Sequence, residues 1–393
     1  MDFHSDICII GNGAIGKAAA LGFARAGLDV ILLGPVRQEA MAGDAWDVRV
    51  YALNHVAHGL LSELRVWEAM DAARIAPVDA MQVMGDAGGK LAFDAYAARV
   101  ASLAWIVEDS NLNRALDAAL QFAAGVRRMA GNAAALQVDE DVASVRLENG
   151  DVVHADLVVG ADGGQSWVRG QCDIGFDYRA YGQRAVVANF SCEKPHRGKA
   201  WQWFTGEEGI VALLPLPGER VSLVWSAPDA LADTLLAHDA EQLAAQVMRH
   251  SGAALGKLTP LPPAQAKAFP LTLLRPHAIT APRVVLVGDA AHVVHPLAGH
   301  GMNLGFADVA SLVQIVGTRE AHRDCGDARL LSRYARARKE DILLMQLTTD
   351  GLERLFSTAA SPLQALRNAG LNVADRAPFF KSRLISHALG KPQ

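Results

Sequence analysis

The segment DICIIGNGAIG, residues 6–16, indicates the fold more directly than any other part of the sequence. Ile7 to Ile10 form a short apolar run, which predicts a buried strand, and a glycine-rich turn follows it. The alanine-rich stretch 14–26 predicts a helix ended by Gly27, and residues 30–33 predict a second strand. This order of elements is that of a βαβ unit.

The turn has the GxGxxG spacing of a dinucleotide-binding loop. Gly11 permits the tight turn, Gly13 lets a pyrophosphate approach the backbone, and Gly16 lets the helix pack close to the sheet. The helix N-terminus would present free N–H groups to the phosphates. We therefore expect the loop to bind a pyrophosphate through Gly11, Gly13, Ala14, Ile15 and Gly16. A structural turn in another α/β fold remains the alternative.

The expected partner of a dinucleotide ribose is missing from this βαβ unit. Dinucleotide folds place an Asp or Glu at the end of the second strand, about 20 residues after the loop. Here that strand reads ILLGP, so the position holds Gly34 followed by Pro35.

Two later strands end in an acid beside a glycine. VVGADGGQSWVR, residues 158–169, contains Asp162 and Gly163, and VVLVGDAAHVVHPLAGHGMNLG, residues 284–305, contains Gly288 and Asp289. Such an acid can accept hydrogen bonds from a ligand without crowding it. The second stretch continues through small residues and Pro296 to a helix expected near Met302, so something large should lie against this backbone.

The composition is that of a large globular protein. The chain has 393 residues, enough for two to three domains, with 51% apolar and 20% charged residues. A net charge of −5 without a basic block argues against nucleic acid as a partner. The four cysteines form no CxxC pair, and neither a signal peptide nor an apolar run long enough to cross a membrane is evident. We expect a cytoplasmic protein with reduced thiols.

The middle of the chain differs from the two α/β parts in its pattern of apolar and turn residues. Between residues 176 and 277 the runs AVVANF, GIVALL and VSLVWS are separated by turn residues, which predicts a mostly antiparallel sheet. From about residue 328 onward the sequence predicts helices. The fold class is thus α/β, with a β-rich region inserted between parts of one α/β domain.

Taken together, the motifs resemble those of the class A, single-component flavin monooxygenases. The closer resemblance is to the ubiquinone-biosynthesis hydroxylases, and it covers nearly the whole chain. It rests on the three stretches above and on DVRVYAL (47–53), WIVEDSNLNRAL (105–116), YGQRAVVANF (181–190), PHRGKAWQWF (195–204), ALLPLP (212–217) and TTDGLERLF (348–356).

The resemblance implies the fold of para-hydroxybenzoate hydroxylase. A discontinuous, Rossmann-like FAD-binding domain would comprise residues 1–75, 97–175 and 278–327. Residues 76–96 and 176–277 would form the β-sheet substrate domain, and residues 328–393 a C-terminal helical region.

The resemblance also implies roles for single residues. Arg49 would reach the FAD phosphates, Asp162 and Gly163 would serve both the flavin and the nicotinamide cofactor, and Asp289 would bind the ribityl chain or the pyrophosphate. The residues expected along the flavin ring are Pro296, Gly299, Gly301, Met302 and Asn303, and Asp109 and Gly288 are also expected to bind the cofactor. This sequence departs from the family pattern at Gly34-Pro35, at Asp109 in place of Asn or Gln, and at His300 in place of Gln.

The activity implied is hydroxylation of an electron-rich aromatic ring by FAD, with NAD(P)H as electron donor and O2 as co-substrate, through a C4a-hydroperoxyflavin. The leading substrate is a prenylated phenol of ubiquinone biosynthesis. Hydroxylation of another aromatic compound, reduction of a prenyl chain, and a non-catalytic scaffold of a biosynthetic complex are the alternatives. Association with a membrane surface or such a complex, and a homo-oligomer, stay open, and no catalytic side chain stands out.

The β-rich region would supply the substrate pocket. Tyr181, Trp203, Leu213 and Pro215 are the candidates for its wall, with His196 nearby, although packing explains such side chains equally well. We expect no metal, because Asp289, His292 and His295 need not converge and lack a further ligand nearby in sequence. Ser166 lies in no GxSxG elbow, which argues against a hydrolase.

Overall fold

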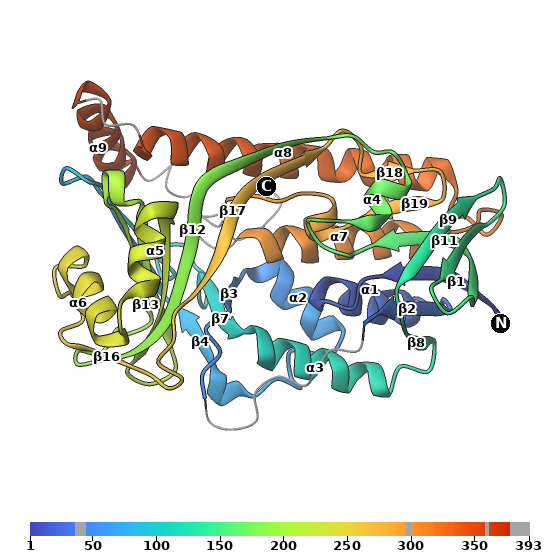
Figure 1. Cartoon of the computed structure of the whole chain (residues 1–393), viewed down its shortest axis with the longest axis horizontal. Coiled ribbons are helices and arrows are strands. Elements are labelled where there is room, and N and C mark those ends of the chain that lie inside the picture. The colour runs from blue at the N-terminus through green and yellow to red at the C-terminus, as the bar shows by residue number, and fades with distance from the viewer. Residues whose placement is uncertain (36–44, 296–299, 358–360, 378–393) are drawn as a thin grey trace.

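The computed structural model describes residues 1–35, 45–295, 300–357 and 361–377. The chain forms two large sheets and one small sheet, with a long C-terminal helix running beside both large ones (Figure 1). The α/β fold class expected from the sequence is confirmed.

The first large sheet contains the βαβ unit. Its main path runs β18 (Thr280–Ala281), β19 (Val284–Leu286), β11 (Val152–Gly160), β1 (Asp2–Ile10), β2 (Val30–Gly34) and β8 (Val126–Ala130). The strands β19, β11, β1, β2 and β8 are mutually parallel neighbours. A hairpin of β10 (Ala143–Leu147) with β11 turns at Gly150, as the Asn149-Gly150 pair predicts, and β9 (Ala133–Val138) extends it.

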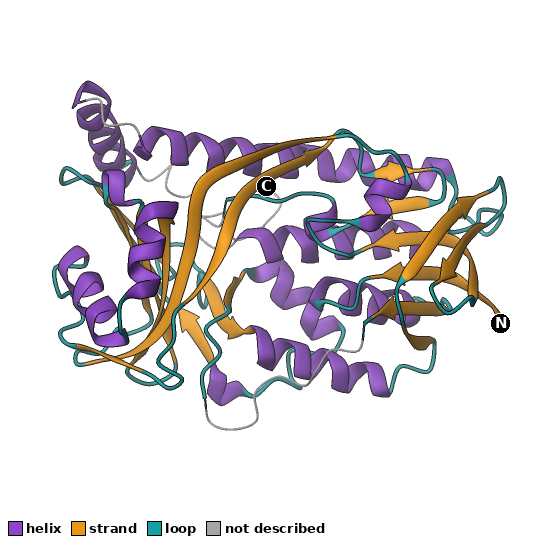
Figure 2. Cartoon of the chain, viewed as in Figure 1, coloured by secondary structure: helices purple, strands orange, loops and turns teal. Residues whose placement is uncertain are grey.

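Helices cover one face of this sheet (Figure 2). They are α1 (Ala14–Arg25), α2 (His55–Glu63), α3 (Asp109–Gln121) and α7 (His300–Gly317), and they enclose one buried apolar cluster with Ile7, Ile9 and Leu32. The small residues of α1 allow α7 to approach closely, since a Cβ added at Gly22 would lie 2.8 Å from Val313. The short α4 (Trp167–Gln171) follows β11 on the opposite face.

The second large sheet is mostly antiparallel, as the sequence predicts. Its path runs β16 (Leu258–Pro260), β12 (Phe176–Cys192), β15 (Arg220–Pro228), β14 (Ile210–Leu216), β13 (Lys199–Phe204), β5 (Ala80–Met84) and β6 (Lys90–Asp94), and β17 (Lys267–Pro276) also pairs with β12. Among the described strands of this sheet, only β13 and β5 pair in parallel. Helices α5 (Asp229–Ala237) and α6 (Ala240–His250) cover its outer face and share its buried cluster (Figure 1).

A small sheet that the sequence did not reveal joins the two large ones. It consists of β3 (Val50–Leu53), β7 (Ala104–Glu108) and β4 (Ile75–Val78), all antiparallel. Ala76 and Ile106 of this sheet pack against Ala200 and Leu216 of the second large sheet. Since β4 spans residue 75, the end expected for the first segment of the FAD-binding domain falls inside a strand.

The C-terminal helices α8 (Ala328–Ser357) and α9 (Ser361–Arg376) complete the fold. The hydroxyl of Tyr334 on α8 donates to the Leu286 carbonyl at 3.1 Å and so fixes the helix to the end of β19. Among the described helices, none has the length and apolarity needed to cross a membrane.

A buried carboxylate ties β19, α7 and α8 together. Asp308 on α7 is 0% exposed; one oxygen accepts from Gly288 N–H at 2.9 Å and from His292 Nε2 at 2.6 Å, and the other accepts from Arg338 Nε at 2.8 Å. Burial alone would raise the pKa of Asp308, but the attraction and hydrogen bonds of His292 and Arg338 outweigh it and hold this pKa below its usual value.

Asp308→Asn should therefore destabilise the protein strongly. Removing the charge leaves Arg338, which is 5% exposed, with only the exposed carboxylate of Asp341 as its counter-ion, and breaking a buried ion pair in this way costs about 3–5 kcal/mol of the free energy of unfolding. Denaturant unfolding followed by tryptophan fluorescence measures the change. The matched control is Asp341→Asn, which removes the 59% exposed partner of the same arginine and should cost less than about 1 kcal/mol.

The difference between wild type and Asp308→Asn should depend on pH. A folded-state pKa below the unfolded one means that the carboxylate stabilises fully above the ordinary Asp pKa of about 4 and loses its contribution as pH falls through the folded pKa. Equal losses for the two Asp variants, or a deficit that grows in acid, would contradict this role.

Candidate functional site

The three motifs meet at one edge of the first large sheet. The parallel strands β1, β11 and β19 end at Ile10, Gly160 and Leu286, so the loops that follow them lie side by side. The Ala161 N–H donates to the Ile10 carbonyl at 2.8 Å, which joins the first two loops directly. Ligands of open α/β sheets bind at this carboxyl edge.

The glycine loop has the geometry that each glycine predicts. Gly11 has a φ of +117°, and an added Cβ would lie 2.2 Å from the Ala161 carbonyl oxygen. A Cβ at Gly16 would lie 1.8 Å from the Gly11 carbonyl oxygen, whereas a Cβ at Gly13 would meet no atom within 4 Å. Gly13 is the N-cap of α1 and offers no capping side chain. The N-terminal N–H groups, beginning at Ala14, therefore open onto free space.

Asp289 lies in a recess at the end of β19. Its side chain is exposed, yet the surrounding protein desolvates it and raises its pKa, against the attraction of His292 and Arg49. Exposure together with desolvation describes a side chain that lines a hollow within the molecule. Gly288, at φ +60°, makes the turn possible, and Ile15 of α1 packs 3.4 Å from where its Cβ would be.

One carboxylate oxygen of Asp162 accepts a hydrogen bond, and the other has no partner. Oδ2 accepts from Val168 N–H in the first turn of α4 at 3.0 Å, while the buried Oδ1 has no hydrogen-bond partner. Gly163, at φ +85°, leaves open space where a side chain would stand. A buried carboxylate oxygen without a partner is costly, and a ligand donor would relieve that cost.

Arg49 is held by the small sheet and by α3. The Asp47 carboxylate accepts from the Arg49 and Ser110 N–H groups at 3.0 and 3.2 Å, and the Arg49 carbonyl accepts from Asp109 N–H at 2.9 Å. The guanidinium lies over the Phe269 ring at 4.7 Å. The Asp109 carboxylate itself accepts from Tyr51 Oη at 2.8 Å. Asp109 thus braces the segment that carries Arg49.

The start of α7 is fixed by Asn303. Its Oδ1 accepts from Asn54 N–H at 2.9 Å and its Nδ2 donates to the Ala52 carbonyl at 2.8 Å, so this side chain binds the backbone at the end of β3. Gly301 has open space beside it, and Met302 is half-buried. The α7 helix begins at His300, two residues before the expected start. Pro296 and Gly299 lie outside the described residues, as does the His300 side chain.

Asn12 is a site residue that the sequence did not single out. Its Nδ2 donates to the Pro35 carbonyl at 2.5 Å, and its Cγ lies 2.7 Å from where a Cβ of Gly34 would be. The asparagine amide therefore fills the place beside the glycine loop where an acid on β2 usually reaches. The sequence could have pointed to Asn12, because the acid is missing from β2 and a polar residue stands inside the GxGxxG loop.

Three of the residues expected to line the substrate pocket lie on the outer face of the second sheet. Leu213 is fully buried in the cluster shared with α5 and α6, and Trp203 packs against that cluster, so both lie on the outer face. Side chains alternate along a strand, which places the buried Pro215 on the same face. The inner face of β14, toward the small sheet, instead carries Ala212 and Leu214, both half-buried.

Tyr181 lies elsewhere, between the second sheet and α8. Its hydroxyl donates to Asp350 Oδ1 at 3.2 Å, and its ring meets that of His295 at 5.0 Å. Burial lowers the pKa of His295 to about 4, against the attraction of Asp350, so this histidine is neutral near pH 7. His196 bonds the Leu216 and Gly218 carbonyls through Nε2 and serves the β13–β14 region structurally.

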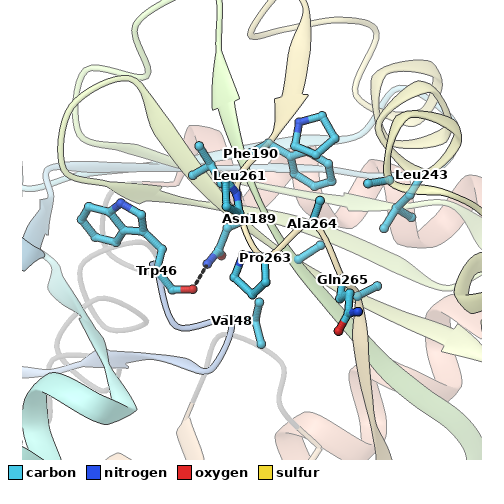
Figure 3. Close-up of a pocket in the computed structure, with 14 residues that line it drawn as sticks. Trp46, Val48, Asn189, Phe190, Leu243, Leu261, Pro263, Ala264 and Gln265 are labelled. Atoms are coloured by element: carbon cyan, nitrogen blue, oxygen red, sulfur yellow. Dashed lines mark hydrogen bonds between the residues drawn. The ribbon is translucent and has the colours of Figure 1, made fainter. Parts of the chain in front are cut away.

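A separate hollow lies between β12 and the segment before β3 (Figure 3). Its lining is mainly apolar and includes Val48, Phe190 and Leu261. Asn189 spans it, donating to the Trp46 and Asp47 carbonyls at 3.4 and 2.9 Å. Because the hollow lies away from the carboxyl edge of the parallel strands, it is a contact between the sheets rather than the cofactor site. In the described part of the chain, no three His, Cys, Asp or Glu side chains gather as a metal site.

The residues at the carboxyl edge fit FAD. Free helix N–H groups with open space at Gly13 suit a pyrophosphate, and the recessed Asp289 and the unpartnered Asp162 oxygen suit hydroxyl or amide donors. Each of these features needs a donor or an anion that the described residues do not supply.

Known proteins share this sequence and fold. A family model described as FAD binding domain matches residues 4–343. The chain is 36% identical over 391 residues to the 3-demethoxyubiquinol 3-hydroxylase of Escherichia coli, covering 98% of each chain, and 35% identical to the ubiquinone hydroxylase UbiL of Rhodospirillum rubrum, covering 99% of this chain and 90% of that protein.

A solved structure supports the fold independently. PqsL of Pseudomonas aeruginosa in complex with 2-aminobenzoylacetate superposes with a TM-score of 0.78 at 24% identity, over 94% of this chain and 99% of that one. The chain therefore belongs to the FAD-dependent ubiquinone hydroxylases, within the family defined by this FAD-binding domain.

Proposed function

We propose that this protein hydroxylates the aromatic ring of a prenylated phenol on the route to ubiquinone. The reaction replaces a ring C–H by C–OH, with O2 and NAD(P)H consumed and water and NAD(P)+ released. The convergence of the glycine loop, Asp162 and the recessed Asp289 at one sheet edge supports the cofactor half of this proposal. The names of the relatives at 36% and 35% identity support the substrate half.

Bound FAD supplies the redox chemistry, and the chain holds and shields it. The α1 N-terminus and Gly13 bind the pyrophosphate, Arg49 adds a positive charge near Asp289, and the Asp289 and Asp162 carboxylates accept hydrogen bonds. The backbone at Gly301, Met302 and Asn303 lines the ring, and the N-terminus of α7 stabilises negative charge there.

The second sheet limits water and shapes the substrate site. Its inner face carries Gln202, Ala212 and Leu214, opposite the outer face that α5 and α6 cover. Gln202 is buried and polar between apolar neighbours, so it can orient a phenolic hydroxyl. Its apolar wall would keep water away from the site where the bound cofactor supplies its chemistry. A prenylated substrate partitions into bilayers, so the protein works from the cytoplasm at a membrane surface, alone or within a biosynthetic complex.

The direct test combines purified holoenzyme with NAD(P)H, oxygen and short-chain prenylated phenols. Mass spectrometry should find a product heavier by one oxygen atom, with NAD(P)H consumed in equal amount. Deleting the gene should lead to accumulation of the matching quinone precursor. Oxidation of NAD(P)H without any hydroxylated product, with no precursor accumulating, would refute the proposal.

Asp289→Ala should weaken FAD binding. A charge-assisted hydrogen bond contributes about 1.5–3 kcal/mol, and about 1.4 kcal/mol is tenfold in affinity, so the dissociation constant should rise roughly ten- to a hundredfold. Fluorescence titration of apoprotein with FAD measures it. The control is Asp233→Ala on α5, whose carboxylate is 73% exposed and far from the carboxyl edge, and its affinity should equal that of wild type. An unchanged affinity in Asp289→Ala would remove this residue from the site.

Asn12 should replace the missing acid of β2 as the polar partner of the adenosine ribose. Asn12→Ala should raise the FAD dissociation constant about two- to tenfold, the value of one neutral hydrogen bond. Gly34→Glu alone should bring no gain, because its Cβ would lie 2.7 Å from Asn12 Cγ. The double variant should recover the affinity, since the shortened residue 12 makes room for the carboxylate. A gain in Gly34→Glu alone would show that the ribose lacks a partner in wild type.

A further inference from the structure

Three hydrogen-bonded side chains lead from α8 to the segment before α7. Glu353 of α8 is 6% exposed, and its Oε1 accepts from Gln183 Nε2 of β12 at 3.0 Å. The Oε1 of Gln183 lies 3.4 Å from His295 Nε2. His295 stands between the turn that carries Asp289 and the start of α7, which are two of the parts expected to hold the cofactor. The third side chain therefore lies close in sequence to both.

These contacts determine which nitrogen of His295 carries the proton. An amide nitrogen donates and an amide oxygen accepts, so the bond to Glu353 turns the oxygen of Gln183 toward the histidine. The Nε2 of His295 must then be the N–H that donates to this oxygen. Burial lowers the pKa of His295 to about 4, against the attraction of Asp350, so the ring is neutral near pH 7. The other nitrogen, Nδ1, therefore keeps its lone pair and can accept a hydrogen bond.

This Nδ1 has no hydrogen-bond partner in the described part of the chain. The residue is 0% exposed, so bulk water does not reach it. The neighbouring ring of Tyr181 does not supply a proton, because its hydroxyl already donates to Asp350 at 3.2 Å. A buried acceptor without a donor is costly, and an O–H or N–H group of a ligand would remove that cost.

Gln183 lies on the side of the second sheet that is expected to meet the substrate. Val186 and Phe190 of the same strand belong to the outer buried cluster. Side chains alternate along a strand, which places Gln183 on the inner face, as it does Gln202 of β13. The strands β15 and β14 separate β12 from β13. One hydroxyl group therefore cannot meet both Gln202 and the histidine that Gln183 binds.

A cavity of about 250 Å³ lies beside these side chains. Gln183 and Glu353 line it, and Ile210, Pro228 and Phe356 provide apolar wall. The remaining lining residues are Gly206, Glu207 and Gly209. A mainly apolar hollow with a few polar groups is typical of a site for a small organic molecule.

We propose that Nδ1 of His295 accepts the hydrogen bond of the substrate's phenolic hydroxyl, and that Gln183 and Glu353 are positioning residues that hold its tautomer. A phenol that donates this bond carries more negative charge on its oxygen and in its ring, which suits hydroxylation of an electron-rich ring. The inference deepens the proposed function and rests on it for the class of substrate.

The test measures binding to the oxidised holoenzyme without NAD(P)H, so that no turnover takes place. The two probes are a short-chain prenylphenol and the prenylbenzene that lacks its hydroxyl group. The change in flavin absorbance on titration gives each dissociation constant. Wild type should bind the phenol about two- to tenfold more tightly, the value of one neutral hydrogen bond. His295→Leu should bind the two probes equally.

Two milder substitutions separate the ring nitrogens. An Asn amide reaches roughly the position of Nδ1 and a Gln amide that of Nε2, so His295→Asn should keep part of the preference and His295→Gln should lose it. This pair decides the matter if His295→Leu does not fold with FAD. The matched control is His277→Asn at a side chain that is 63% exposed, and its preference should equal that of wild type.

Substitutions of Glu353 test the positioning role. Glu353→Gln should keep the preference, because its carbonyl oxygen still accepts from Gln183. Glu353→Leu should lower it, because the Gln183 amide can then turn and either ring nitrogen of His295 can carry the proton. Equal preferences in these two variants would remove Glu353 from the proposal.

Equal binding of the two probes by wild type would overturn the inference, as would a preference that His295→Leu and His295→Gln retain. A preference lost in Gln202→Leu and kept in the His295 variants would place the hydroxyl at Gln202 instead. The two proposals fail separately. Hydroxylated product from a wild type without the preference refutes the role of His295 alone. A preference that depends on His295, with no hydroxylated product from any phenol, refutes the catalytic function alone.

Discussion

The buried carboxylate of Asp308 is the constraint on which the cofactor edge depends. It binds the backbone of Gly288, the ring of His292 and the guanidinium of Arg338, and so fixes the turn after β19 against α7 and α8 at once. Asp289, the next residue along that turn, takes its position from this network and has no direct part in it. An interior anion is tolerated only when its hydrogen bonds are complete, so the turn has little freedom to move.

The two large sheets differ in the role expected of each: the first carries the cofactor edge, and the second faces the expected substrate site. The glycine loop, Asp162 and Asp289 lie on loops after parallel strands, whereas the surface expected to meet the substrate is one face of an antiparallel sheet. The small sheet connects them through Arg49: its strand β3 follows this residue directly, and Asn189 of the second sheet binds the backbone just before it. The backbone that carries Arg49 is thereby linked to the second sheet.

Most of the cofactor edge was predictable from the sequence, because parallel strands bring their carboxyl ends together and each loop carries a glycine at a strained or crowded position. The face of the second sheet that each side chain of β14 occupies could not be predicted, since a shift of one residue exchanges Leu213 for Leu214 and reverses the face. In an apolar strand that lacks alternating polar residues, the sequence does not show which residues face which side of the sheet. Asn12 was not predicted, because its expected role depends on the missing acidic side chain at Gly34, which lies more than 20 residues away in sequence. The small sheet was not predicted, because its strands are short and far apart in sequence.

The parallel pairings also determine when the protein can bind its cofactor during synthesis. The β1 strand needs β11, about 150 residues later, and β11 needs β19, which ends at Leu286. At typical translation rates the glycine loop emerges on the order of ten seconds or more before Asp289. During that interval the edge of β11 that pairs with β19 has no partner strand. The β5–β6 hairpin likewise has no partner until β13 has been made. The edge that carries Asp289 is therefore complete only when most of the chain has been made, and until then unpaired strand edges need protection from other chains.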